Sequence, residues 1–335
     1  MSNFRMAWCM PHVIHVGPCE SPGGIRTVMR TLAKHPPEGW TASMLASHAP
    51  SRLAMLRAAR KAARDLRSMP EDGSTLVHLH AASDWSLRRK LRLAAVCKAP
   101  VVLHLHSGDT ARWLGASPKR VEQVRSAIQR HVNTVVVLDD AWKVVLEPLI
   151  GKVVVVPNPI DPVHRPAVGR DKEGHHLLVM GRDAPVKRRS FAVDVLTSVR
   201  HHRPSVHLHL TGGQPSQEEG WTRHGWLSEA ERLELLHNSS ALLLPSRFEG
   251  QPLAALEALA CGVPVIADGG LVGLPHTVVR PPEATVEAWT QAVLATLNAP
   301  VDATMLCSSV AHHTVEHVAS RWGEVYSTVQ QTSTT

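Results

Sequence analysis

Short apolar runs rich in β-branched residues alternate with stretches of helical periodicity along almost the whole chain. Each run has the length of one buried strand, and the stretch that separates it from the next run predicts a helix. Strands that alternate with helices form parallel sheets with right-handed crossover connections. The pattern therefore predicts an α/β fold built from doubly wound, Rossmann-like sheets.

The same alternation occurs in both halves of the chain, so we expect two such sheets. The expected strands are 12–16, 76–80, 101–106, 134–138 and 153–156 in the first half, and 177–180, 206–210, 241–244 and 263–267 in the second. The expected helices are 25–32, 52–67, 85–96 and 119–131, followed by 190–199, 228–236 and 252–260.

A proline-rich segment divides the two halves. Four prolines stand between Pro157 and Pro166, where neither a helix nor a central strand can continue. A chain of 335 residues is long enough for two domains. We expect a first domain over 1–157, a linker over 158–174, a second domain over 175–310, and a C-terminal helix in 311–335 that can return to the first domain. Ligands of such sheets bind beyond the carboxyl ends of the strands, which here should face a cleft between the domains.

Charge is distributed unevenly over the two halves. Residues 1–165 hold 23 Lys and Arg against 12 Asp and Glu, whereas residues 166–335 hold 13 against 17. The first half should therefore favour a polyanion or an anionic surface. Hydrophobic residues make up 44% of the chain, which excludes a disordered protein, and no apolar run approaches the ~20 residues of a membrane helix. Five scattered cysteines and an N-terminus without a leader pattern predict a cytoplasmic protein.

The segment 243–266 has the densest set of candidate functional residues. Gly250 permits a tight backbone after a buried strand, Pro252 suits the first turn of a helix, and Gly262 closes that helix. The free N–H groups near Gln251–Ala254 then form an anion site. Glu249 stands directly before this anion site, where the alternative role is that of a solvated loop acid.

Glu257 stands in a helix that is otherwise apolar from Leu253 to Ala260. Burying a carboxylate without a partner is very costly, so the partner of Glu257 decides its role. The hydroxyls of a sugar or a ribose are suitable donors. An arginine inside the fold is the alternative partner, and the sequence leaves both open.

A short basic loop follows the expected strand at 177–180. Gly181 ends that strand, and Arg182 and Lys187 follow in the loop. The planar fork of an arginine and the point charge of a lysine together suit a diphosphate. A solvated basic loop is the alternative interpretation of so short a run.

Gly23 and Gly24 stand between the first expected strand and the first expected helix. A glycine pair in this place lets the backbone approach a ligand closely. A simple turn is the alternative, and the G-x-G-x-x-G spacing of a dinucleotide site is absent.

Two H-x-H pairs lie on expected strands of the first half. The alternation of a strand places His104 and His106 on one face, with His106 nearest the carboxyl end, and His78 and His80 repeat the pattern. Two such strands can form a zinc site, but no cysteine lies nearby and no nearby carboxylate has ligand spacing. The sequence therefore favours no metal site.

The segment 52–67 predicts an amphipathic helix with a basic face and an alanine face. The residues of its basic face are Arg52, Arg57, Arg60, Lys61, Arg64 and Arg67. One interpretation is a solvated helix whose alanine face packs on the first sheet. The other is a surface that rests on anionic lipid, to which the segment 88–92 adds four more basic residues.

These pieces, in this order, resemble the family 4 glycosyltransferases of the GT-B fold from about Val13 to Tyr326. The most specific part is 246–266, which resembles the family's Glu-x7-Glu pattern with Glu249 and Glu257 as its acids. The other matches are Pro157–Asp161 with a Pro-Asn-Gly-Ile-Asp strand end, Gly181, Arg182 and Lys187 with a Gly-Arg…Lys-Gly loop, Gly23 and Gly24 with a glycine pair, His106 with a cleft histidine, and Gly225–Leu227 with a segment that meets the nucleotide base.

The resemblance implies two Rossmann-like domains and retaining transfer of a sugar from a nucleotide-diphosphate sugar to a hydroxyl acceptor, without a cofactor or a metal. It implies positive potential on the leaving diphosphate from Arg182 and Lys187, and contacts of Glu249 with the donor sugar and Glu257 with the ribose. The implied catalytic residues are His106, Arg182, Lys187 and Glu249. The implied donor-binding residues are Gly23, Gly24, Gly181, Gly225, Leu227, Gly250, Gln251, Pro252, Leu253 and Glu257. The expected partners are the donor, a glycan or lipid-linked acceptor of cell-surface glycan or glycolipid synthesis, and an anionic inner membrane face.

The chain departs from the family pattern at two positions. Arg188 replaces the glycine after the loop lysine, and Pro159 replaces the glycine after Asn158. The first departure can narrow the diphosphate loop, whereas the second lies in the expected linker.

Other functions stay open at this point. Nucleotide-sugar epimerases and sugar phosphorylases can share the same architecture, and shared architecture alone does not decide between them. A nucleic-acid-binding or other polyanion-binding protein without catalytic activity is an alternative of another class. Nucleic acid is not an expected partner, because aromatic residues make up 4% of the chain and no nucleic-acid-binding motif is present.

Overall fold

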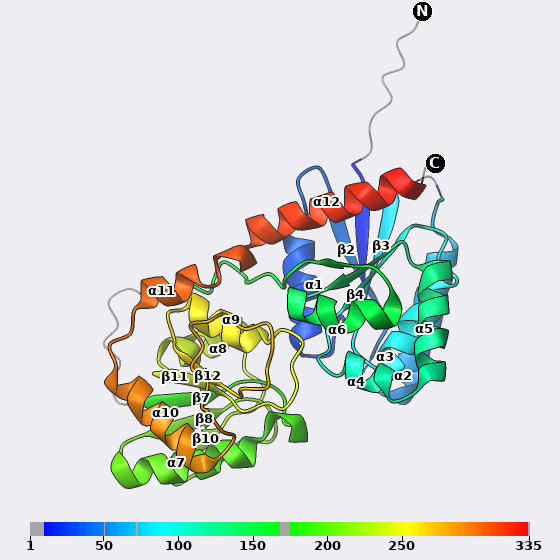
Figure 1. The fold of residues 1–335 in the computed structure, drawn as a ribbon. Coiled ribbons are helices and arrows are strands. Elements are labelled where there is room, and N and C mark those ends of the chain that lie inside the picture. Colours follow the sequence, from blue (N-terminus) through cyan, green and yellow to red (C-terminus); the bar gives the residue numbers. More distant parts are fainter. Residues whose placement is uncertain (1–9, 50, 72, 168–174, 334–335) are drawn as a thin grey trace, which may run out of the picture. The chain divides into compact units, whose positions relative to one another are not determined.

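The computed structural model describes residues 10–49, 51–71, 73–167 and 175–333, and it divides into two compact units (Figure 1). Unit 1 comprises Met1–Pro159 together with Val315–Thr335, and unit 2 comprises Ile160–Thr314. The last seven residues of the expected linker, 168–174, lie outside the described residues.

Unit 1 contains a six-stranded parallel sheet in the order β2-β1-β3-β4-β5-β6. Its strands are β1 (His12–Gly17), β2 (Thr41–Ala46), β3 (Thr75–Ala81), β4 (Val101–Leu105), β5 (Thr134–Val137) and β6 (Val153–Val155). Its helices are α1 (Gly24–Lys34), α2 (Arg52–Arg67), α3 (Trp85–Ala94), α4 (Thr110–Gly115), α5 (Pro118–His131), α6 (Asp140–Ile150) and α12 (Val315–Ser333).

Helix α12 comes from the end of the sequence and belongs to unit 1, where it lies beside α1 (red and blue in Figure 1). Its Trp322 and Tyr326 are fully buried. The Tyr326 hydroxyl forms a 2.8 Å hydrogen bond with Nδ1 of His78 on β3. The C-terminal helix therefore completes the core of the first sheet. It begins at Val315, after a 3-10 turn at Ala311–His313.

Unit 2 contains a six-stranded sheet in the order β12-β11-β7-β8-β10-β9, in which only β9 is antiparallel to its neighbour. Its strands are β7 (His176–Val179), β8 (His207–Leu210), β9 (Ser216–Glu218), β10 (Trp221–Arg223), β11 (Ala241–Leu244) and β12 (Val265–Ala267). Its helices are η1 (Pro185–Lys187), α7 (Arg189–His202), α8 (Glu229–His237), α9 (Leu253–Ala260), α10 (Val286–Asn298), α11 (Ala303–Ser308) and η2 (Ala311–His313).

Helices cover both faces of the unit 2 sheet because successive strand residues point to opposite faces. Leu177 and Val179 of β7 pack in one core with side chains of α7 and α10. Leu178, which stands between them, packs in the other core with side chains of α9. The predicted α/β class with two doubly wound, Rossmann-like sheets is therefore confirmed.

The surface of unit 1 corrects one expectation about its basic segments. In the segment 88–92, Lys90 lies on the buried face of α3, so it cannot add its charge to an anionic surface, whereas Arg88 and Arg92 are exposed.

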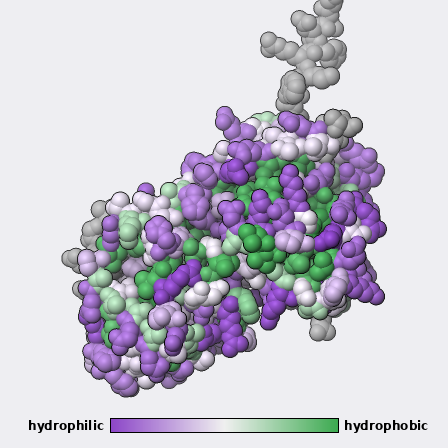
Figure 2. Space-filling model, in the orientation of Figure 1, coloured by the Kyte–Doolittle hydropathy of each residue, from purple (hydrophilic) through white to green (hydrophobic). Residues whose placement is uncertain are grey.

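Hydrophobic residues also show over α6 in Figure 2, where Val144 is 74% exposed. None of the described helices is both long and apolar enough to cross a membrane.

Candidate functional site

The predicted residues of unit 2 lie at one edge of its sheet. Strands β7, β8, β10 and β11 run parallel, so their carboxyl ends meet at that edge. Three hydrogen bonds join the loops that follow them. These bonds are Gly181 N–H to Thr211 Oγ1 (3.0 Å), Gly212 N–H to Gly225 O (3.0 Å) and Arg247 N–H to Val186 O (2.9 Å). The structure thus brings together the predicted loops at Gly181, Gly225 and Glu249.

Lys187 and Glu249 form the central ion pair of this edge. Lys187 Nζ lies 2.5 Å from Glu249 Oε1, and the two side chains are 17% and 15% exposed. Gly181 has a φ of 130°, and a Cβ added there would lie 3.3 Å from Lys187 Cε. A glycine at 181 therefore leaves room for the lysine as well as satisfying the backbone. Arg182 is exposed, and no ion pair joins it to another described residue.

Arg188 and Arg189, which follow the loop lysine, have different tasks. Arg188 adopts a left-handed backbone (φ 46°, ψ 47°), which explains why the resembled family has glycine there. Its guanidinium pairs with Asp268 at 3.2 Å and lies 4.1 Å from the centre of the Phe191 ring. Arg189, which no sequence pattern indicated, is buried and donates to the carbonyls of Gly181, Thr211 and Gly212. Arg189 therefore ties together the ends of β7 and β8.

The N-terminus of α9 is the predicted anion site. The helix begins at Leu253 after Pro252, whose side chain offers no capping hydrogen bond. The first N–H groups of a helix have no partner within it, and the helix dipole places positive potential there. Gly250 and Gln251 are buried beside it. Ser246 is also buried, and its Oγ has no hydrogen-bond partner among the described residues.

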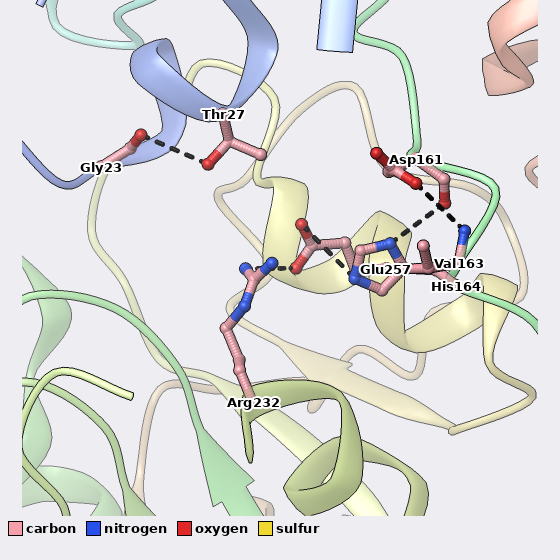
Figure 3. A network of polar contacts seen from close by, with 7 residues as sticks. All are labelled: Gly23, Thr27, Asp161, Val163, His164, Arg232 and Glu257. Carbon is pink, nitrogen blue, oxygen red and sulfur yellow. Dashed lines mark hydrogen bonds and ion pairs between the residues drawn. The ribbon is translucent and has the colours of Figure 1, made fainter. Parts of the chain in front are cut away.

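Glu257 has the arginine partner that the sequence left open (Figure 3). Arg232 of α8 donates from Nη1 to Glu257 Oε2 at 2.9 Å, and His164 Nε2 lies 3.9 Å from Glu257 Oε1. Glu257 is 2% exposed, whereas the Arg232 side chain is 26% exposed. The ring of His164 is positioned in turn by the carbonyl of Asp161 at 3.2 Å. The Glu257 carboxylate therefore already has the Arg232 guanidinium as a partner within the fold. A ligand that binds Glu257 would share this carboxylate with Arg232.

The segment Gly225–Leu227 follows β10 and precedes α8. Ser228 caps α8, and Glu231 completes the capping box, so the helix start fixes this segment. The Gly225 carbonyl is bound to the loop after β8, and the intervening Trp226 is 57% exposed. The backbone of Gly225 is thus fixed from both sides, by the loop after β8 and by the start of α8.

In unit 1, Gly23 and Gly24 form the start of α1. Gly23 has a φ of 149°, and a Cβ there would meet nothing within 4 Å, so its backbone is approachable. The Gly23 carbonyl accepts hydrogen bonds from the N–H and the Oγ1 of Thr27, at 3.2 and 3.5 Å (Figure 3). No side chain caps α1. The glycine pair thus exposes a helix N-terminus, as predicted.

His106 stands directly after β4, and the rings of His104 and His106 lie on one face with centroids 3.9 Å apart, as predicted. His106 Nε2 lies 2.9 Å from His80 Nδ1. Burial, and to a lesser extent the Lys90 ammonium, lower the pKa of His106 to about 3. At neutral pH this imidazole is therefore uncharged.

The histidine cluster of unit 1 is larger than the sequence indicated, because His15 of β1 joins it. The parallel register pairs His15 with His78 and His80 with His104. Two groups of three imidazoles place ligand nitrogens within 4.8 Å of one another. The groups are His15, His78 and His80, and His80, His104 and His106. Only the register of three strands reveals this, so the H-x-H spacing alone could not.

Lys90 is a second buried group of unit 1. It is 1% exposed and donates a hydrogen bond to the Ser47 hydroxyl. Burial, and then the neighbouring Arg89, lower the pKa of Lys90 to about 7, while the Cys19 thiol acts in the opposite direction. No carboxylate in the described part of the chain forms an ion pair with Lys90.

Comparisons with known proteins agree with this architecture. Residues 174–299 match the family model of the glycosyl transferases group 1. A glycogen synthase of Mycobacterium tuberculosis is 29% identical over 244 residues, which cover 65% of this chain and 59% of that protein. The chain therefore spans about three fifths of the length of this relative.

Solved structures of low sequence identity share the fold. Anabaena HepE in complex with UDP and glucose superposes with a TM-score of 0.73 at 14% identity, covering 95% of this chain and all of that chain. A sucrose-phosphate synthase from Thermosynechococcus elongatus gives a TM-score of 0.70 at 16% identity, covering 96% and 100%. The chain has the GT-B fold of glycosyltransferases. Residues 174–299 match the model of the group 1 glycosyl transferases, so the predicted resemblance to glycosyltransferases is confirmed at this level.

Proposed function

We propose that this protein transfers a sugar from a nucleotide-diphosphate sugar to a hydroxyl group of a glycan or lipid-linked acceptor, with retention of the anomeric configuration. The observation that supports this best is the Lys187–Glu249 pair beside Gly181 at the carboxyl edge of unit 2. This edge lies within the residues that match the group 1 glycosyl transferases. The resemblance of Glu249 and Glu257 to a Glu-x7-Glu pattern supports the retaining outcome.

The chemical requirement is stabilisation of the diphosphate as it leaves. Lys187, Arg182 and the N-terminus of α9 supply fixed positive potential where negative charge grows. Lys187 is now held by Glu249, and we infer that a diphosphate competes for the ammonium. Glu249 is then available to accept hydrogen bonds from the hydroxyls of the donor sugar. Because these groups meet the charge, the proposed reaction needs neither a metal nor a cofactor.

In the transfer step the bond between the anomeric carbon and the diphosphate oxygen breaks, and a bond to the acceptor oxygen forms. We propose attack from the face on which the diphosphate departs, with the acceptor's proton passing to a diphosphate oxygen. His106 is proposed to contact the sugar as a neutral imidazole, in keeping with its lowered pKa.

The donor is proposed to be a UDP-sugar. The Anabaena protein binds UDP and glucose, and a pneumococcal O-GlcNAc transferase of the same fold, at 14% identity and a TM-score of 0.63, binds UDP and GlcNAc. Glu257 is proposed to accept the ribose hydroxyls on Oε1 while Arg232 holds Oε2. The backbone of Gly225 and Leu227 is proposed to meet the base.

The acceptor is proposed to belong to cell-surface glycan or glycolipid synthesis, with the enzyme at the cytoplasmic face of a membrane. The exposed basic side chains of α2 support this location. These side chains are Arg57, Arg60, Lys61, Arg64 and Arg67. Three of them, Arg60, Arg64 and Arg67, also line one hollow of the surface, which suits an anionic headgroup.

A thermal-shift panel of UDP-, GDP-, ADP- and dTDP-sugars tests the donor directly, because a ligand that binds the folded state raises the melting temperature by mass action. We expect UDP-sugars to give the largest shift, and incubation with candidate acceptors to release UDP. Conversion of the donor to an epimer without any acceptor would show an epimerase instead. Absence of a shift with every nucleotide sugar would contradict the proposed function.

A further inference from the structure

Five imidazoles from three neighbouring strands meet on one face of the unit 1 sheet. The residues are His15, His78, His80, His104 and His106. The first four are at most 1% exposed. Filling a core does not require histidines, because each buried ring nitrogen needs a hydrogen-bond partner that an aliphatic side chain does not need. So dense a group therefore calls for a ligand as an explanation.

The three outer imidazoles are spaced for a common ligand. One nitrogen from each of His80, His104 and His106 lies within 4.8 Å of the others. His80 Nδ1 and His106 Nε2 are only 2.9 Å apart. His104 Nε2 is buried and has no hydrogen-bond partner among the described residues. A buried ring nitrogen without a hydrogen-bond partner thus belongs to the same cluster as two further imidazoles.

His15 and His78, the two inner imidazoles, form hydrogen bonds with the remaining ring nitrogens of His80 and His104. His80 Nε2 lies 3.0 Å from His15 Nδ1, and His104 Nδ1 lies 3.3 Å from His78 Nε2. His78 Nδ1 in turn bonds to the Tyr326 hydroxyl at 2.8 Å. If these outer nitrogens carry the protons, Nδ1 of His80 and Nε2 of His104 are both free to coordinate. Metal-bound histidines characteristically donate their other N–H to such partners.

We propose that His80, His104 and His106 bind a divalent transition-metal ion of the zinc type, with one position left for water. Three imidazoles and an open fourth position suit Zn²⁺ and its neighbours Co²⁺, Ni²⁺ and Cu²⁺. Bonds of the usual length place the ligand nitrogens about 3.3 Å apart, so His80 Nδ1 and His106 Nε2, which lie 2.9 Å apart, must separate slightly. Only His106 is partly exposed, which provides the entry path.

The inner group of His15, His78 and His80 is the weaker candidate for the same ion. Its three rings are fully enclosed. Both ring nitrogens of His78 are already engaged, Nδ1 by the Tyr326 hydroxyl and Nε2 by His104. The proposal therefore assigns these residues a positioning role. The site shares only His106 with the proposed glycosyl transfer, whose charged groups lie in unit 2.

Metal binding is tested on the full chain without a polyhistidine tag, after chelator treatment and desalting. Titration with Co²⁺ should give one ion per chain with the visible d–d bands of a four-coordinate site, and Zn²⁺ should displace it. His104→Gln and His106→Gln should each weaken Co²⁺ binding by at least about tenfold. Loss of a group that only hydrogen-bonds to a metal ligand already has an effect of this size.

His209→Gln is the matched control. His209 belongs to a separate row of hydrogen-bonded histidines, in unit 2, where its ring nitrogens lie 3.0 Å from those of His176 and His224. Within the described residues, this row does not bring three ligand nitrogens together. This variant should bind Co²⁺ as the wild type does. If His104→Gln fails to fold, as judged by circular dichroism, the partly exposed His106→Gln decides. Failure to retain one ion, or unchanged binding in a folded His106→Gln variant, would overturn the proposal.

Discussion

The two units treat polar groups at their sheet edges in opposite ways. Unit 2 holds oppositely charged side chains in pairs, Lys187 with Glu249 and Arg232 with Glu257. Unit 1 holds uncharged imidazoles, and beside them Lys90 without an acidic partner in the described residues. A paired charge can exchange its partner for a charged ligand when the released group gains hydrogen bonds from that ligand, whereas a buried neutral group can only donate or accept a hydrogen bond or coordinate an ion. The comparison therefore assigns diphosphate binding to unit 2.

The largest effect is expected from breaking the charges of unit 2. Arg182→Ala and Lys187→Ala should each reduce turnover about 10²–10³-fold, as does loss of one preorganised group that stabilises developing charge. Steady-state kinetics with the donor identified by thermal shift provide the measurement. Arg182 is an exposed loop residue and Lys187 ends the short 3-10 helix η1, outside the sheet, so folding should survive. Near-normal turnover of the double variant would remove this loop from the mechanism.

Charge reversal on α2 tests the basic character of unit 1. Replacing Arg60, Lys61 and Arg64 with Glu should weaken binding to anionic vesicles by about 1 kcal/mol or more per residue. Co-sedimentation should show wild-type binding that rises with anionic lipid and falls with salt.

A variant of α4 and α5 with the same change in net charge serves as the control for α2. It carries Glu at Arg112, Lys119 and Arg130, which are also exposed basic residues of unit 1. This variant should bind vesicles more tightly than the α2 variant. Equal loss in both would reflect net charge alone, and wild-type protein that ignores anionic vesicles at low salt would favour a soluble acceptor.

Glu257→Gln asks whether the buried acid of unit 2 serves the ligand or the fold. Nucleotide affinity should fall by about 1.5–3 kcal/mol, the range of hydrogen bonds to a charged group, as measured by calorimetry with UDP. Arg232→Gln should lower the free energy of unfolding more than Glu257→Gln does, because it leaves a buried carboxylate without its cation. It nevertheless keeps the carboxylate that accepts the ribose hydroxyls. Unchanged UDP affinity in Glu257→Gln would make Glu257 a structural partner of Arg232 only.

Sequence patterns predicted the strands that carry apolar or β-branched runs and missed β2, β9 and β10. Strand β2 lies at the sheet edge with its residues half exposed, and β9 and β10 are only three residues each. Such strands have no continuous apolar run to reveal them. The partner of Glu257 was equally out of reach, because Arg232 is 25 positions away and only the packing of α8 on α9 brings it near. The place of His15 in the histidine cluster depends on the register of β1 with β3. The hydrogen bonds of Arg189 depend on how the loops after β7 and β8 fold around it, so neither could be predicted from the residue alone.

Lys90→Met removes the unpaired cation of unit 1. Its pKa is about 7 in the folded state and near 10.5 in the unfolded state, so between these values the unfolded chain binds more protons and wild-type stability rises with pH. Wild-type unfolding free energy should therefore rise relative to that of the variant by about 1 kcal/mol per pH unit from pH 7 to 10. Urea unfolding at several pH values measures this difference. Parallel pH profiles would show that Lys90 is charged in the folded protein.

The smallest expected effect is that of a chelator on turnover. The diphosphate charge is met in unit 2 by Lys187, Arg182 and the start of α9, so the reaction should not depend on an ion held by imidazoles in unit 1. Chelation should therefore strip the proposed ion, as shown by elemental analysis, while turnover stays largely unchanged. If the chelator abolished turnover and one divalent ion restored it, the division between the units would fail. His80 and His104 would then join His106 in the catalytic machinery, and variants of His80 and His104 should lose turnover in proportion to the metal they fail to bind.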